Sequence, residues 1–151
     1  MIKLSRLADY GVVLMTHVAA DAERQRTAAA AAAATRIPEP TVSKIMKALA
    51  RARLLESQRG INGGYTLARA PADISIAEIV TAVDGPIALT ECQETDGACT
   101  FEAFCPTRGN WHMINDAVHR ALDEISLSDM TAPFPSFLPR AGTAGRKSVG
   151  P

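Results

Sequence analysis

The sequence predicts a mainly α-helical chain with a small β-hairpin, arranged as a winged helix-turn-helix followed by a long C-terminal helix. Three observations predict this fold. Apolar residues recur at helical spacing in several separate segments. A proline-marked turn, "IPEP", precedes one of these segments. A glycine-rich turn between two short strand-like runs follows the same segment.

Length and composition bound the class of protein. The chain has 151 residues, of which 47% are hydrophobic and 21% charged, as is typical of one globular domain or a small domain with an appendage. No run of 18 apolar residues occurs, so no membrane span is expected. The three cysteines are an odd number without an export signal, which argues against a disulfide framework and favours a cytoplasmic protein.

Three helices are expected in the first third of the chain. The first runs from about Ser5, its N-cap, to Asp21. The alanine-rich stretch "RTAAAAAAATR" predicts a short second helix capped by Thr27, because alanine is the best helix former. The third begins near Thr41, with an apolar stripe on one face and polar residues on the other. The stripe consists of Val42, Ile45, Met46 and Leu49, and the polar face of Ser43, Lys44, Lys47 and Arg51.

The next segment, "LLESQRGINGGYTLA", predicts a β-hairpin. Its two strand-like runs flank a turn of Gly and Asn residues, which tolerate positive φ. Helices, a turn, a third helix with a basic outer face and then a hairpin are the element order of a winged helix-turn-helix. In that fold the third helix enters the DNA major groove, and the hairpin forms the wing.

The formal net charge of zero hides an uneven distribution. Residues 36–69 carry seven basic and two acidic residues, a net +5, whereas residues 70–130 carry two basic and eleven acidic residues, a net −9. The basic segment contains the third helix and the hairpin, so a nucleic-acid footprint is expected there. Charge alone is equally compatible with solvated helix faces.

Two further helices are expected after the hairpin. Ser75 and Glu78 form a capping box before one of them, which "DGP" ends at Asp84. Pro106 suits the first turn of a last, long helix with a heptad-like apolar seam. The seam consists of Trp111, Ile114, Val118, Ala121 and Ile125, with Leu122 beside it. A second copy would bury this seam in a homodimer; the alternative is packing on the chain's own N-terminal helix.

These elements divide the chain into four parts. They are a winged helix-turn-helix DNA-binding domain (1–86), a cysteine loop (87–106), a dimerisation helix with a short cap (107–130) and a flexible tail (131–151) rich in Pro, Gly, Ser and Ala. No phosphate-binding glycine loop and no Cys–His catalytic motif occurs, so neither an enzyme nor a small-molecule substrate is expected.

All the cysteines of the chain lie in "CQETDGACTFEAFC", as Cys92, Cys99 and Cys105. Structural zinc sites need four ligands, usually in pairs two to four residues apart, and these spacings are wider. A regulatory disulfide is a second interpretation, and three unrelated buried thiols are a third. Thiolates in a wide loop also suit an iron–sulfur cluster. Spacing alone does not choose among these four.

Five stretches carry a resemblance to a known family. They are "KLSRLADYGVVLM", "IPEPTVSKIMKAL", "RGINGGYTLAR", "ISIAEIVTAVDGPIALTEC" and "CPTRGNWHMIN". Together they resemble the winged-helix iron–sulfur transcription regulators that include IscR, NsrR and RirA, and most closely the branch that regulates the SUF cluster-assembly operon. The resemblance covers residues 1–130 and is specific because the motifs occur in combination.

The resemblance implies a cluster on Cys92, Cys99 and Cys105, with the third helix in the major groove and the wing toward the minor groove. One departure bears on the cluster. Arg108 stands where IscR has a histidine three residues after the last cysteine, and a guanidinium is not a metal ligand. Members similar to NsrR instead use an aspartate from the first helix of the partner subunit, and Asp9 matches that position. The alternative for Asp9 is a first-turn acid that interacts favourably with the dipole of its own helix. In that case His112 or a small exogenous ligand would complete the site. The cluster type follows from the fourth ligand, and we favour 4Fe–4S over 2Fe–2S.

The function expected from the sequence is a homodimeric transcription regulator that represses iron–sulfur cluster assembly genes and binds a double-stranded DNA operator. Lys44, Lys47 and Arg51 are expected to contact phosphates, and Thr41 and Ser43 base edges. The wing residues expected at the DNA are Arg59, Gly60, Asn62, Gly63 and Gly64. The alternative is a zinc-containing or thiol-redox winged-helix repressor without a cluster.

Overall fold

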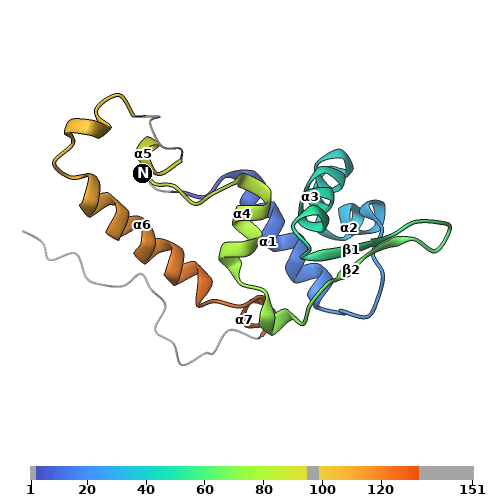
Figure 1. The fold of residues 1–151 in the computed structure, drawn as a ribbon. Helices are drawn as coiled ribbons and strands as arrows, with labels where there is room; N and C mark the ends of the chain where they lie inside the picture. The colour runs from blue at the N-terminus through green and yellow to red at the C-terminus, as the bar shows by residue number, and fades with distance from the viewer. Residues whose placement is uncertain (1–2, 95–98, 133–151) are drawn as a thin grey trace, which may run out of the picture.

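The fold is a winged helix from which a hairpin and a long helix project on opposite sides (Figure 1). The computed structural model describes residues 3–94 and 99–132. The elements are α1 Arg6–Ala19, α2 Ala28–Thr35, α3 Glu39–Arg51, β1 Leu55–Gln58, β2 Gly64–Leu67, η1 Pro71–Asp73, α4 Ile76–Asp84, α5 Glu91–Glu94, η2 Glu102–Phe104, α6 Arg108–Asp123 and α7 Leu127–Thr131. This architecture confirms the mainly helical fold with a β-hairpin wing.

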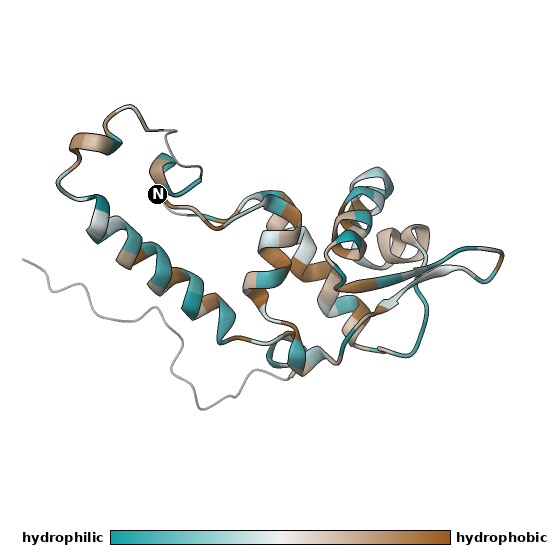
Figure 2. Cartoon of the chain, viewed as in Figure 1, coloured by the Kyte–Doolittle hydropathy of each residue, from teal (hydrophilic) through white to brown (hydrophobic). Residues whose placement is uncertain are grey.

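The hydrophobic core lies where α1, α3 and α4 pack against one another. The apolar stripe of each helix faces the other two, and Figure 2 shows these inner faces in brown. The nine side chains Leu14, Met15, Val18, Val42, Ile45, Met46, Leu49, Ile79 and Val80 are at most 3% exposed. Burying one such side chain contributes about 1.5–3 kcal/mol. Because each stripe occupies one helix face, its burial determines which face of α3 points outward.

The helix-turn-helix is formed by α2 and α3. Thr27 Oγ1 accepts a hydrogen bond from the backbone N–H of Ala30 (3.1 Å), as expected of the N-cap of the alanine helix. α3 begins at Glu39, two residues before the start near Thr41 expected from the sequence. Pro40 is accommodated in this first turn because N–H groups there have no intrahelical acceptor.

The wing is the antiparallel pair β1 and β2, with Leu55 opposite Leu67 and Gln58 opposite Gly64. A third segment supports it: the backbone N–H and C=O of Arg26 both pair with Tyr65 at 2.9 Å. Gly64 permits this approach, since a Cβ there would lie 3.0 Å from the carbonyl oxygen of Arg26. The hairpin itself is as the sequence predicts, whereas the bridge to Arg26 had no sequence signal.

The end of the described chain returns to the core through a helix that the sequence did not predict. The backbone N–H of Leu127 donates to the carbonyl of Ile74 (2.8 Å), and that of Ile76 donates to the carbonyl of Ile125 (2.9 Å). Leu127 is fully buried, and α7 packs on α1 and η1. The tail expected over 131–151 lies outside the described residues from 133 onward.

α6 stands away from the core and buries none of its residues. It packs on α4 and α5, not along α1 as the alternative to dimerisation required. Pro106 lies just before the helix, which starts at Arg108 with Thr107 as N-cap, so the expected place of Pro106 in the first turn is wrong. No described helix is both long and apolar enough to span a membrane.

The C-terminus of α3 has the hydrogen bonds of a Schellman motif. The backbone N–H of Leu54 donates to the carbonyl of Leu49, and that of Arg53 to the carbonyl of Ala50, both at 3.0 Å. This motif requires a left-handed residue at its centre, and Arg53 has φ 59°. Such a conformation costs a residue with a Cβ roughly 1–2 kcal/mol, which glycine does not pay.

We therefore expect Arg53→Gly to raise the free energy of unfolding by about 1 kcal/mol, measured by urea denaturation. The matched control is Lys47→Gly, an exposed basic residue within the right-handed part of α3. That change should lower the free energy by about 1 kcal/mol. Equal destabilisation by both substitutions would contradict the assigned strain.

Candidate functional site

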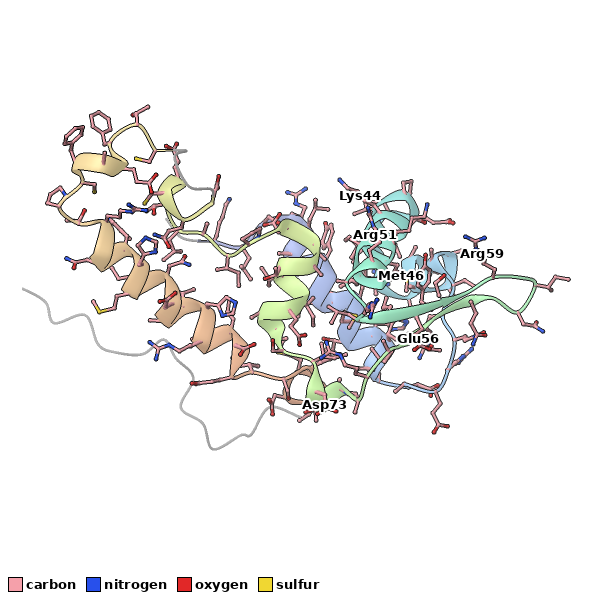
Figure 3. All side chains as sticks on the ribbon, viewed as in Figure 1. Lys44, Met46, Arg51, Glu56, Arg59 and Asp73 are labelled. Carbon is pink, nitrogen blue, oxygen red and sulfur yellow. The ribbon has the colours of Figure 1, made fainter. Side chains whose placement is uncertain are left out.

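The outward face of α3 is basic. Lys44, Lys47 and Arg51 are exposed, and Thr41 and Ser43 at the N-terminal half are partly exposed. This face lies opposite the buried stripe, so the packing of the core presents all five side chains that the sequence assigned to DNA. Figure 3 shows Lys44 pointing out of α3 while Met46 points inward. A row of cations on a protruding helix has the charge and shape to enter a major groove and contact phosphates.

The wing extends beside this helix and also presents a cation. Arg59 is exposed, and in Figure 3 it points to the same side of the molecule as Lys44. Gly60 has φ 113°, which begins the turn, and the backbone N–H of Gly63 closes it on the carbonyl of Gly60 (3.0 Å). The turn places Ile61 at the tip, fully exposed at 105%, a residue not selected from the sequence. The sequence did give a signal for this exposure, because Ile61 lies between Gly60 and Asn62, two residues of the predicted turn.

Charged side chains also lie at the base of the wing. Arg26, which pairs with the wing through its backbone, lies near Asp21, with Nη2 3.9 Å from the carboxylate oxygen Oδ2. Burial, and next the charge of Arg26, lower the pKa of His17 from its ordinary value. Both effects disfavour the protonated form of His17.

The cysteine segment begins with α5, which carries Cys92. Cys92 is buried, and its Sγ lies 3.2 Å from Thr90 Oγ1. The preceding loop is attached to α6 by a single amide side chain. Asn115 Oδ1 accepts from the backbone N–H of Leu89 (3.1 Å), and Asn115 Nδ2 donates to the carbonyl of Ile87 (3.0 Å). This role of Asn115 has no local sequence signal, because both partners are more than 25 residues away in the chain.

Cys105 lies at the start of α6 in an environment that favours its thiolate. Its Sγ lies 3.4 Å from Thr107 Oγ1. Hydrogen bonds from the Thr107 side chain and backbone, and the charge of Arg108, lower the pKa of the Cys105 thiol. The thiolate, not the thiol, is the form of cysteine that binds metals.

Arg108, three residues after Cys105, forms an ion pair. Its Nη2 lies 2.5 Å from Glu102 Oε1. The pair joins the first residue of α6 to the first residue of η2, on either side of Cys105. A guanidinium has no lone pair for a metal, so Arg108 acts on the loop's shape and charge instead.

The three thiols fit an iron–sulfur cluster in their chemistry but not as a closed site within one chain. All three are free, with Cys99 and Cys105 partly exposed. Within 3–94 and 99–132, no group of three or more His, Cys, Asp or Glu side chains is arranged to hold a metal ion. Asp9 is exposed in the first turn of α1, on a different element from the cysteines. In that position its negative charge interacts favourably with the dipole of α1, which is the alternative role predicted for Asp9.

The apolar side of α6 is without cover in the described chain. Trp111 and Ile114 are 37% and 41% exposed, and Ala121 is also exposed. Ile125, predicted as the last residue of the seam, lies beyond the end of α6 at Asp123 and is 42% exposed. Val118 is partly buried, and Leu122 packs against the core. The predicted seam is thus an apolar face of α6 that is mostly exposed and touches the core through Leu122.

The chain is similar to known transcription regulators in both sequence and structure. The model of the Rrf2 family, described as an iron-dependent transcriptional regulator, matches residues 4–133. The HTH-type transcriptional regulator NsrR of Geobacillus kaustophilus is 33% identical over 130 residues, covering 85% of this chain and 88% of the relative.

Two solved structures have the same fold. CymR, the global cysteine regulator of B. subtilis, superposes with a TM-score of 0.68 at 30% identity, over 87% of this chain and 97% of CymR. IscR of T. potens superposes with a TM-score of 0.65 at 29% identity, over 85% of each chain.

The environment of Cys105 leads to a prediction about thiol reactivity. Thr107→Val removes the hydroxyl beside Cys105 Sγ, so the thiol pKa should rise and alkylation by iodoacetamide at pH 7 should slow several-fold. Mass spectrometry of the metal-free, reduced protein measures each thiol separately, with Cys99 as the internal control. An unchanged ratio of Cys105 to Cys99 labelling would show that Thr107 does not set this pKa.

Proposed function

Since the chain belongs to the Rrf2 family of iron-dependent transcriptional regulators, we propose that it is a homodimeric repressor that controls iron–sulfur cluster assembly genes through a cluster of its own. The family consists of transcription regulators, so the chain is a DNA-binding regulator and not an enzyme. One observation carries the proposed sensing: every cysteine lies in one segment, between the winged helix and α6.

In the proposed DNA complex, α3 lies in the major groove of one operator half-site. The exposed cations Lys44, Lys47 and Arg51 contact phosphates, while Thr41 and Ser43 reach base edges from the N-terminal half of the helix. The wing follows the minor groove. Arg59 enters it, and the turn of Gly60, Asn62, Gly63 and Gly64 brings the backbone close to the DNA.

The dimer forms through α6. The seam consists of Trp111, Ile114, Val118, Ala121 and Leu122 on α6, with Ile125 just beyond the helix. It is apolar and largely uncovered, which is costly for an isolated chain. A second copy covers the same face by two-fold symmetry and places two recognition helices for a two-fold operator. The functional division is then DNA-binding domain 1–86, cysteine loop 87–106, dimerisation helix 107–130 and tail 131–151. The regulator acts in the cytoplasm, where its operator is.

Cys92, Cys99 and Cys105 are the proposed ligands of the cluster, with Asp9 of the second copy as the fourth. A bound cluster supplies a site that iron supply or oxidants alter, and 4Fe–4S is favoured over 2Fe–2S. Thr107 and Arg108 lower the pKa of the Cys105 thiol, and Asn115 holds the start of the loop on α6. Participation of Asp9 would join the cysteine loop of one copy to α1 of the other.

The alternative is a zinc-containing or thiol-redox repressor without a cluster. Its support is the similarity to a protein called a global cysteine regulator. The two functions share the winged helix and differ only in what the thiols do.

The cluster and its fourth ligand are tested on protein purified without oxygen. We expect visible absorption with iron and acid-labile sulfide in matching amounts, and an altered spectrum in Asp9→Asn with the dimer intact. Asp73→Asn, an exposed carboxylate on η1, is the control and should leave the spectrum unchanged. Zinc without sulfide, or a disulfide by non-reducing mass spectrometry, would replace the cluster with the alternative. An unchanged spectrum in Asp9→Asn would remove Asp9 as a ligand.

The phosphate role of α3 is tested by Lys47→Ala. Affinity should fall by a similar factor for operator and unrelated DNA, and the slope of log affinity against log salt should decrease by about 1. Ser43→Ala is the companion variant, which should instead reduce discrimination between sequences. Fluorescence anisotropy over a salt series measures both. A loss confined to the operator in Lys47→Ala would contradict the phosphate contact.

A further inference from the structure

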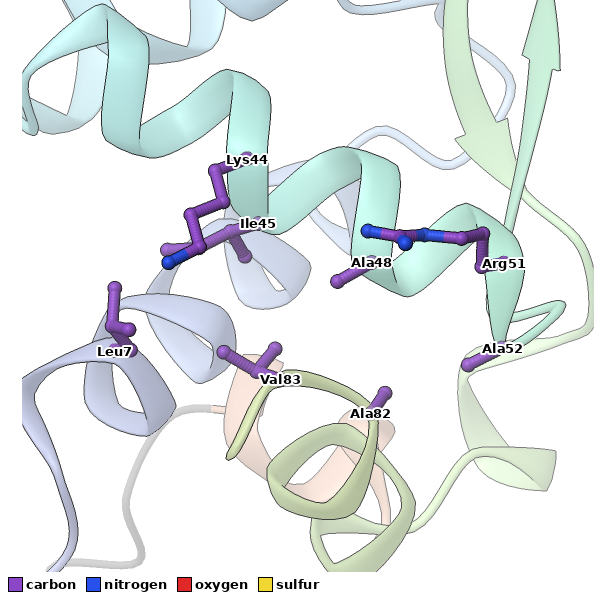
Figure 4. Close-up of a pocket in the computed structure, with 8 residues that line it drawn as sticks. All are labelled: Leu7, Lys44, Ile45, Ala48, Arg51, Ala52, Ala82 and Val83. Atoms are coloured by element: carbon purple, nitrogen blue, oxygen red, sulfur yellow. The ribbon is translucent and has the colours of Figure 1, made fainter. Parts of the chain in front are cut away.

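A groove of about 470 Å³ opens between the recognition helix and its neighbours, α1 and α4 (Figure 4). Its lining is Leu7, Lys44, Ile45, Ala48, Arg51, Ala52, Ala82 and Val83. Six of these side chains are apolar, and both polar ones are cations of α3. The groove therefore suits an occupant with an apolar surface and nearby negative charge.

Two aromatic side chains on η2 and its flank have no apolar cover. Phe101 is 75% exposed and Phe104 is 90% exposed, a large area for two rings separated by three positions. Figure 2 shows this turn as a brown patch at the end of the molecule. The described residues near them include the acids Glu91 and Glu94 of α5 and Glu102, which pairs with Arg108. Exposed apolar area of this kind is typical of a contact surface.

The two surfaces are complementary but far apart in one chain. In Figure 1, η2 lies beyond the N-terminal end of α6, whereas α3 lies across the core on the side of the wing. The loop is also attached to α6 through Asn115 and through the Arg108–Glu102 ion pair. A second copy is therefore the source of the occupant.

We propose that Phe101 and Phe104 of one copy dock in the α1–α3–α4 groove of the second copy. The contact rests on the proposed dimer, since α6 begins immediately after this segment and its uncovered seam continues from it. Leu7, in the groove wall, shares the first turn of α1 with Asp9. The approach that brings the cysteine loop to Asp9 thus also brings the rings to the groove.

This contact gives the cysteine segment a direct mechanical connection to the recognition helix. Ile45, Ala48 and Arg51 belong to α3, so a ring in the groove packs against the flank of the helix that reads DNA. Rearrangement of the loop withdraws the rings and alters the support of α3.

The test places the photoreactive residue p-benzoylphenylalanine at Phe104 in a tagged chain, coexpressed with an untagged, isotope-labelled chain. After irradiation of purified mixed dimers, mass spectrometry should find the cross-link on labelled residues 44–52 or 82–83, that is, in the second copy. The same probe at Ile61, an equally exposed apolar residue at the wing tip, is the control and should not label the groove.

A second variant fills the groove. Ala48→Phe on the labelled chain should reduce the Phe104 cross-link at least tenfold, while circular dichroism verifies the fold. Cross-links confined to the same chain or to α6, or no reduction by Ala48→Phe, would overturn the docking. Sedimentation separates the two proposals: a dimer without the groove cross-link refutes only this contact, whereas a monomer refutes the proposed dimer as well.

Discussion

The mutual burial of three apolar helix faces is the constraint on which the rest of the molecule depends. The stripes of α1, α3 and α4 can all be buried only in one rotational setting of each helix. That setting turns Lys44 and Lys47 outward and Met46 inward, so the core determines which residues of α3 face solvent. The same packing positions the wing. β1 follows the Schellman turn at Arg53, and β2 is held by the backbone hydrogen bonds between Tyr65 and Arg26.

The second half of the chain follows a different principle. α6 has no buried residue, and the cysteine segment exposes two phenylalanines. In the proposed homodimer, a second copy would cover these surfaces. Ligands placed where two copies meet would couple metal binding to subunit geometry. A change of about 1.4 kcal/mol in that coupling would change operator affinity tenfold.

Sequence patterns predicted the features that depend on local spacing. The stripe of α3, the Ser75–Glu78 capping box and the glycine turn of the wing each lie within a few residues. Features that depend on distant partners were missed: α7, the Arg26–Tyr65 bridge and the amide contacts of Asn115. The cysteines were recognisable as a group from their positions in one segment. Spacing along the chain did not identify a fourth ligand, and Asp9 was assigned that role only through the family resemblance.

The most direct test of the central claim compares operator affinity in one anaerobic sample before and after removal of the cluster by a chelator. Sedimentation on both states verifies that the dimer persists. The account predicts at least a tenfold change in affinity for the operator and little change for unrelated DNA. Equal operator affinity in the two states would contradict it and leave a winged-helix regulator whose cysteines do not control DNA binding.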